Sequence, residues 1–128
     1  MGFFDRFNDN ASLQNGWLEM TTLVDLDKAI EQSFDKPVVL FKHSVRCGIS
    51  VGAKYALEDK WDFQEDEMIF YYLDLINYRD VSNAIAEKLN VIHQSPQVIV
   101  LRNGKAVHSS THHAIGVPNL KQGLEKAS

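Results

Sequence analysis

The chain has 128 residues and a single cysteine, Cys47, and this scarcity limits both its stabilisation and its chemistry. One thiol cannot form an internal disulfide, so the fold must rely on its apolar core, and a reducing, cytoplasmic setting is expected. Ser50 stands where a CxxC oxidoreductase has its second cysteine. Because a hydroxyl cannot resolve a mixed disulfide, any resolving thiol has to come from another molecule.

Long apolar runs, an excess of basic charge and nucleotide-binding loops are absent as well. The longest apolar candidates, MIFYYL and VIVL, have the length of strands rather than the roughly 18 residues of a membrane span. The 17 acids and 13 bases are interspersed, with a net charge of -4, and form no basic stripe for nucleic-acid phosphates. Neither GxGxxG nor a Walker pattern occurs. We therefore expect a soluble protein without bound cofactor, membrane or nucleic acid.

Linkers and repeats are missing too, so the chain is expected to form one domain. Its 45% apolar content is enough for a core of ordinary size. We assign residues 17–128 to this domain and residues 1–16, which lack the regions of a secretory signal, to an N-terminal arm that docks on it. A monomer is the expected state.

Hydrophobic periodicity predicts alternating strands and helices in the order βαβαβαββα. Continuous apolar runs are typical of strands in a covered sheet, and three- and four-residue steps are typical of helices with one buried face. The pair Asn103-Gly104 is typical of a two-residue type I′ hairpin turn, and Asp80 is expected to cap the third helix. The predicted strands are 17–20, 38–41, 68–74, 97–101 and 105–108, and the predicted helices are 23–34, 47–61, 80–89 and one from about residue 118. These elements predict an α/β domain with a central mixed sheet.

The stretch FKHSVRCGIS places Cys47 between a buried strand and a helix start. There the sulfur would meet unpaired backbone N–H groups and the positive end of the helix dipole, both of which stabilise a thiolate. Lys42, His43 and Arg46 would add positive potential if they turned toward the sulfur, and would otherwise be solvated surface residues. Ser50 could donate a hydrogen bond across one helical turn. The alternative is a buried cysteine that packs as a small hydrophobe.

A strand, CGIS at a helix start and a proline before a later strand resemble the thioredoxin fold. The resemblance makes Cys47 the nucleophile and implies that Pro96 is a cis proline facing it. The segments KHSVRCGIS, RDVSNAIAEKLNVIHQSPQVIV and HHAI are more closely similar to the monothiol bacilliredoxins, the YtxJ-like proteins of the bacillithiol system. This similarity covers most of residues 17–116. Gly48 departs from the family, which more often has proline there.

The resemblance implies an enzyme that removes bacillithiol, a low-molecular-weight thiol and here the co-substrate, from mixed disulfides on client proteins. Cys47 would attack the bacillithiol sulfur and carry the adduct until a second thiol regenerates it. Ser44, Ser95 and Pro96 would form the substrate groove, and Gly48, Ser50 and Arg46 would support the nucleophile. We also expect Arg46 and Lys42 to meet the carboxylates of bacillithiol.

Two other functions remain open from the sequence. CGIS differs by one residue from the CGFS of monothiol glutaredoxins, which hold an iron–sulfur cluster with glutathione. A thioredoxin-like binding module with an inert thiol is the second alternative. A metal site is not expected, since His108, His112 and His113 lack an acid or cysteine at familiar spacing and are assigned to the surface. The role of His93, near Pro96, is left open.

Overall fold

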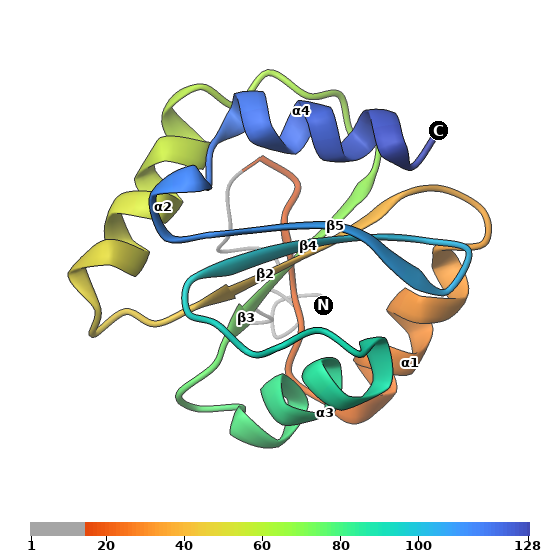
Figure 1. The fold of residues 1–128 in the computed structure, drawn as a ribbon, viewed down its shortest axis with the longest axis horizontal. Helices are drawn as coiled ribbons and strands as arrows, with labels where there is room; N and C mark the ends of the chain where they lie inside the picture. Colours follow the sequence, from red (N-terminus) through yellow and green to blue (C-terminus); the bar gives the residue numbers. More distant parts are fainter. Residues whose placement is uncertain (1–14) are drawn as a thin grey trace, which may run out of the picture.

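The computed structural model describes residues 15–128, which form one five-stranded sheet with helices on both faces (Figure 1). The order of elements is the predicted one, with a 3₁₀ turn added before the last helix. The predicted arm lies outside the described residues except for its last two. No described helix is both long and apolar enough to cross a membrane. The elements are β1 (Leu18–Glu19), α1 (Leu23–Gln32), β2 (Val38–His43), α2 (Gly48–Asp59), β3 (Ile69–Asp74), α3 (Arg79–Leu89), β4 (Gln97–Arg102), β5 (Lys105–Thr111), η3 (His112–Ala114) and α4 (Val117–Lys126).

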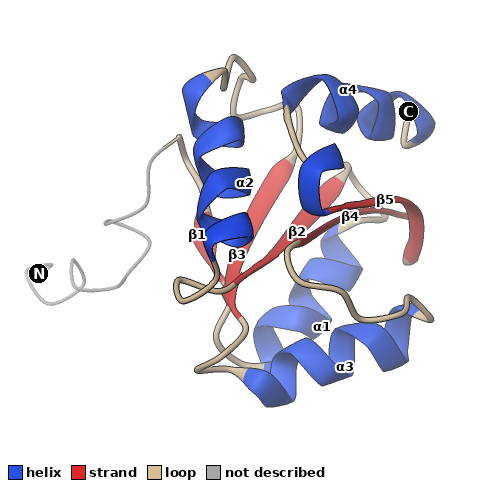
Figure 2. Cartoon of the chain, turned by 60° about the vertical axis from the view of Figure 1, so that its left-hand side comes forward, coloured by secondary structure: helices blue, strands red, loops and turns tan. Residues whose placement is uncertain are grey.

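Strand β2 lies at the centre of the sheet, whose strand order is β1-β3-β2-β4-β5. It pairs in parallel with β3 and antiparallel with β4, so the sheet is mixed, as expected. Every residue of β2 is buried. Because side chains alternate along a strand, Val39 and Phe41 enter the core under α2 and α4, and Val38 and Leu40 enter the core over α1 and α3. Figure 2 shows the two helix layers on opposite faces of the sheet.

Three helix boundaries differ from the prediction. Helix α1 ends at Gln32 instead of residue 34, and Phe34 is exposed. Helix α3 begins at Arg79 with Tyr78 as its N-cap, so Asp80 lies in the first turn and does not cap the helix. An acid there still favours the helix through the macrodipole. Helix α2 ends at Asp59, before Trp61, and Ile49 is exposed. The buried side chains of α2 are Ser50, Ala53 and Leu57. The first buried side chain of the helix is therefore a serine and not Ile49.

The hairpin between β4 and β5 has the predicted turn. Asn103 and Gly104 both have positive φ, at 55° and 78°, as a type I′ turn requires. Ser33 fixes the turn: its hydroxyl accepts a hydrogen bond from the Gly104 N–H at 2.8 Å, and its carbonyl accepts one from the Asn103 N–H at 2.7 Å. Strand β5 continues three residues beyond the predicted end, since Thr111 still pairs with Gln97.

Gly104→Ala should destabilise the protein by about 1–3 kcal/mol, because a Cβ would meet the Phe34 ring at 2.9 Å and because φ is positive. Chemical denaturation measures the free energy of unfolding. Gly52→Ala is the matched control, since its Cβ meets nothing within 4 Å inside α2, and it should stabilise by up to about 1 kcal/mol. Equal effects of the two substitutions would contradict this account of the turn.

Candidate functional site

Cys47 lies between β2 and α2 and is the N-cap residue of α2, as the sequence indicated. Its backbone N–H donates to the Ser44 carbonyl at 3.2 Å, and its own carbonyl accepts from the Val51 N–H at 3.0 Å. The side chain is partly exposed. This placement leaves the sulfur accessible and close to the unpaired N–H groups of the first helical turn.

The surroundings of Cys47 favour its thiolate. The pKa of Cys47 is lowered, first by the backbone N–H of Ser50, then by the backbone N–H of Ile49, with a further contribution from the Ser50 hydroxyl and partial opposition from burial. The side chain makes no full capping hydrogen bond, so these groups act mainly through their dipoles. An accessible thiol with a lowered pKa differs from the buried cysteine that packs as a small hydrophobe.

Ser50 and Ser44 order the loop that carries the thiol. Ser50 is fully buried, and its Oγ accepts a hydrogen bond from the Ser44 N–H at 3.3 Å. Its own hydrogen is therefore available for the Cys47 sulfur. Ser44 is also buried, and its Oγ accepts from the Arg46 N–H at 3.3 Å. Ser44 thus supports the loop, and its place in the substrate groove stays a prediction.

The Ser95–Pro96 peptide bond is cis, as the resemblance implied. The Pro96 carbonyl accepts a hydrogen bond from the His112 N–H at 3.2 Å, which ties this loop to η3. Gln97, the next residue, pairs with Lys42 near the end of β2 that leads to Cys47. Pro96 and Cys47 thus belong to the same end of the sheet. Pro96 itself is buried and Ser95 is half-buried.

Lys42 and His43 are buried, and this corrects the expectation that they are surface cations near the sulfur. Burial lowers the pKa of Lys42 to about 8, and its Nζ lies 3.2 Å from Nδ1 of His93. Burial, and then the charge of Lys54, lower the pKa of His43 to about 4, so its ring is neutral at pH 7. Of the three basic residues, Arg46 alone is exposed. Lys42 cannot meet a ligand carboxylate at the surface in this conformation.

A group of exposed apolar residues, here called the collar, lies in the loop around Cys47 and along α2, and the sequence analysis did not predict it. It consists of Val45, Ile49, Val51 and Tyr55, which make up four of the eight large exposed apolar residues of the described chain. They lie on the outer face of the loop and of α2. Hydrophobic periodicity was used to find the buried face of each helix, so it did not predict apolar residues on the exposed face. Runs of apolar residues on a helix's outer face were the available signal.

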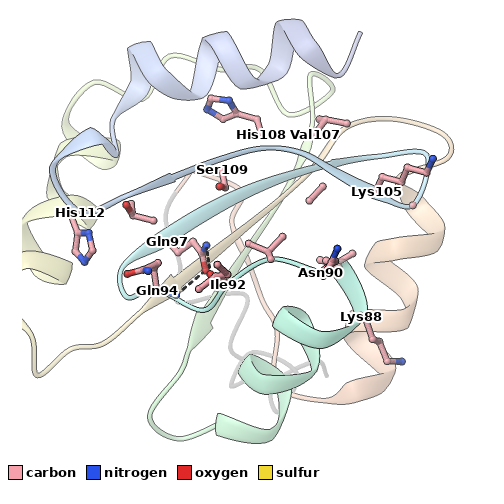
Figure 3. Close-up of a pocket in the computed structure, with 15 residues that line it drawn as sticks. Lys88, Asn90, Ile92, Gln94, Gln97, Lys105, Val107, His108, Ser109 and His112 are labelled. Atoms are coloured by element: carbon pink, nitrogen blue, oxygen red, sulfur yellow. Dashed lines mark hydrogen bonds between the residues drawn. The ribbon is translucent and has the colours of Figure 1, made fainter.

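Cavities on either side of this end of the sheet have different linings. A cavity of about 340 Å³ lies between Gly48, Ile49, His112 and His113 and borders the first turn of α2. A cavity of about 1080 Å³ lies between β5 and the segment from Lys88 to Gln97, and Cys47 does not line it (Figure 3). The smaller cavity borders Gly48, the residue after Cys47, and another cavity, of about 540 Å³, is lined by Val45 and Val51, which precede and follow Cys47 in the sequence.

The histidines do not assemble a metal site within residues 15–128, where no group of three potential ligand side chains occurs. His112 and His113 belong to η3. His108 is partly buried rather than a surface residue, and its Nε2 lies 2.8 Å from Oδ1 of Asn119 on α4. Its role is to join β5 to α4.

Comparisons with known proteins agree with the geometry. A model of the family described as monothiol bacilliredoxin BrxC matches residues 18–120. A solved structure described as a candidate oxidoreductase with a thioredoxin fold is 34% identical, with a TM-score of 0.72, over 84% of this chain and 92% of that chain. Thioredoxins of Fasciola hepatica and Malassezia sympodialis are each 18% identical with TM-scores of 0.65, over 87% and 86% of this chain and 99% and 89% of theirs. These matches support a thioredoxin-like fold and a thiol oxidoreductase role.

Ser50→Ala should raise the pKa of Cys47, because the variant loses the hydroxyl that stabilises the thiolate. The pH dependence of alkylation by iodoacetamide measures this change. Ser82→Ala is the control, since the Ser82 Oγ is also buried but has no hydrogen-bond partner among the described residues. A Cys47 titration that is the same in both variants and in the parent protein would show that the Ser50 hydroxyl does not stabilise the thiolate.

Lys42→Met should change how stability depends on pH. The pKa of Lys42 is about 8 in the folded chain against 10.5 for an unperturbed lysine, so the unfolded chain binds more protons between these values. Stability therefore rises with pH across this window, by roughly 1–3 kcal/mol, and the variant should lose that rise. Denaturation at several pH values tests this, with the exposed Lys28→Met as control. An unchanged slope in Lys42→Met would contradict the burial.

Proposed function

The chain belongs to the monothiol bacilliredoxin BrxC family, and on this premise we propose that it removes bacillithiol from mixed disulfides on client proteins. The coarser role, thiol oxidoreductase, is supported by the family and by the fold. One observation carries the exchange reaction: the sole cysteine of the chain is an accessible N-cap residue with a lowered pKa. The choice of bacillithiol as the small thiol rests on the family. A chain with one such thiol can exchange disulfides but cannot make an internal one.

The proposed reaction has two thiol–disulfide exchange steps. In the first, the Cys47 thiolate attacks the bacillithiol sulfur of the mixed disulfide, the S–S bond breaks, and the client cysteine leaves as a thiolate. In the second, the thiolate of another molecule attacks the bacillithiol sulfur of the Cys47 adduct, and Cys47 leaves as a thiolate. Both steps exchange one disulfide for another, so no external electron acceptor is needed.

The lowered pKa of Cys47 serves the second step more than the first. A lower pKa raises the thiolate fraction but reduces the nucleophilicity of the thiolate, with a Brønsted slope of about 0.4–0.5. The two effects largely cancel when Cys47 attacks. They do not cancel when Cys47 leaves, because a stable thiolate is the better leaving group. The N–H groups of Ser50 and Ile49 therefore favour regeneration of the free enzyme.

Client recognition in this proposal uses the collar and the loop of the cis proline. The collar residues Val45, Ile49, Val51 and Tyr55 offer an apolar surface to the client chain around the disulfide. Backbone groups of Ser95 pair with an extended client segment as an added strand. Arg46, which is exposed and in no ion pair among the described residues, is available for an anionic group beside the disulfide.

The intact mass of the reduced protein after brief exposure to oxidised bacillithiol tests the proposal. We expect rapid formation of one bacillithiol adduct, which free bacillithiol reverses, and no adduct in Cys47→Ser. Oxidised glutathione under the same conditions measures the preference for the small thiol.

Two results would count against the proposal in different ways. An adduct that forms no faster than on an ordinary exposed thiol would remove the enzymatic role. A reactive Cys47 that prefers glutathione would keep the exchange reaction but change the co-substrate. In the first case, anaerobic reconstitution with iron and sulfide would test the alternative of cluster binding.

A further inference from the structure

The Lys42–His93 contact fixes which nitrogen of His93 carries the proton. A lysine ammonium has three donors and no acceptor, so at neutral pH, below its pKa of about 8, Lys42 must donate in the 3.2 Å contact with Nδ1. Nδ1 therefore accepts, and the proton of the neutral ring lies on Nε2. His93 is exposed although Lys42 beneath it is buried. The ring thus presents an N–H donor to solvent, backed by a buried positive charge.

The charges that shift the pKa of His93 are both positive. The pKa of His93 is lowered by burial, then by Lys42 from β2 and by Arg79 at the start of α3, and no carboxylate opposes these effects. Arg79 is exposed and takes part in no ion pair among residues 15–128. Another exposed cation of α3, Lys88, does have an acidic partner, Asp27, at 2.8 Å. A donor and a guanidinium without an acidic partner favour an anion.

The loop that carries His93 is held in place from below. Gln97, which is buried, donates from Nε2 to the Ile92 carbonyl at 3.1 Å and accepts from the Gln94 N–H at 3.3 Å, as Figure 3 shows. Lys42 is the cross-strand partner of Gln97, so two buried polar side chains from adjacent strands fix this loop. His93 precedes the cis Pro96 by three residues. Its N–H donor therefore has a defined place next to the loop proposed to bind the client.

A cavity of about 360 Å³ beside His93 provides room for the anion. Asn83 on α3, one turn after Arg79, lines this cavity together with His93 and adds amide donors. Glu87 also lines it, one turn further from Arg79, and is not among the charges that affect His93. Arg79 does not line the cavity but lies one turn before Asn83 on α3, so an anion that contacts His93 and Asn83 would lie toward the end of α3 that carries the guanidinium.

We propose that the His93 Nε2–H and the Arg79 guanidinium form a subsite for a carboxylate on the disulfide substrate, with Lys42 as the positioning residue beneath His93. The role in substrate selection rests on the proposed function, whereas anion binding does not. The carboxylate comes from the small thiol or from an acidic side chain of the client. The sequence analysis expected Lys42 to contact a carboxylate directly. In this proposal Lys42 is buried and acts through His93.

NMR of the Cys47→Ser protein tests the subsite without any exchange reaction. At pH 7, ¹⁵N spectra of the His93 ring should show a protonated Nε2 and an unprotonated Nδ1, and this preference should weaken as the pH rises through about 8. Addition of sodium succinate should shift the ring signals saturably and raise the pKa of His93, and Arg79→Gln should abolish both effects. The opposite tautomer, or a response that equals that to sodium chloride at the same ionic strength, would overturn the proposal.

Exchange kinetics test the role in selection. Rates of Cys47 with dithiodiglycolate, a dianionic disulfide, and with neutral 2-hydroxyethyl disulfide give a preference ratio at constant ionic strength. Arg79→Gln and His93→Ala should lower this ratio roughly two- to fivefold, as expected for exposed charge pairs, and Lys105→Gln, an exposed cation on β5, should not. A ratio that is unchanged in both subsite variants would overturn the subsite. Slow reaction with both disulfides would instead reject the proposed function.

Two peptides identify the source of the carboxylate. Each is linked to bacillithiol through a cysteine, with Asp beside that cysteine in one peptide and Asn in the other. If Arg79→Gln slows release from both peptides equally, the carboxylate belongs to bacillithiol. If it slows release only from the Asp peptide, the carboxylate belongs to the client. Unchanged release from both peptides would contradict the proposed subsite.

Discussion

The burial of β2 on both faces is the constraint on which the site depends. Its six side chains alternate between two cores, so a shift of one residue would exchange the contents of both. This register fixes where the strand ends and therefore where the loop from Ser44 to Cys47 begins. The same register pairs Lys42 with Gln97, and thereby sets the loop of the cis proline beside the loop of the thiol.

The thiolate of Cys47 is stabilised by backbone dipoles more than by neighbouring cations. The dominant contributions come from the N–H groups of Ser50 and Ile49, which are fixed by the helix itself. Charges on exposed side chains are screened by salt beyond a Debye length of about 8 Å, whereas dipoles in contact with the sulfur are screened little. The reactivity of Cys47 should therefore vary little with ionic strength, unlike the recognition of charged substrates.

Most of the fold could be predicted from the sequence because its patterns are local. The apolar run of β2, the positive-φ turn at Asn103-Gly104 and the helix start at Cys47 each depend on neighbouring residues alone. The burial of Lys42 and His43 could not be predicted in this way. Polar side chains at a strand end usually reach solvent, and here covering segments far away in the sequence enclose them. Their contacts, such as Lys42 with His93, join residues 51 positions apart.

The buried Ser50 hydroxyl has a kinetic consequence for the Cys47 adduct. In a dithiol protein, the second cysteine of the same molecule displaces the adduct, at a rate that does not depend on the concentration of free thiol in solution. Here the corresponding position holds a hydroxyl that is fully enclosed and occupied by the Ser44 N–H. The lifetime of the adduct is then inversely proportional to the concentration of outside thiol. In the proposed reaction, the steady-state fraction of the protein that carries the adduct would therefore depend on the ratio of mixed disulfide to outside thiol.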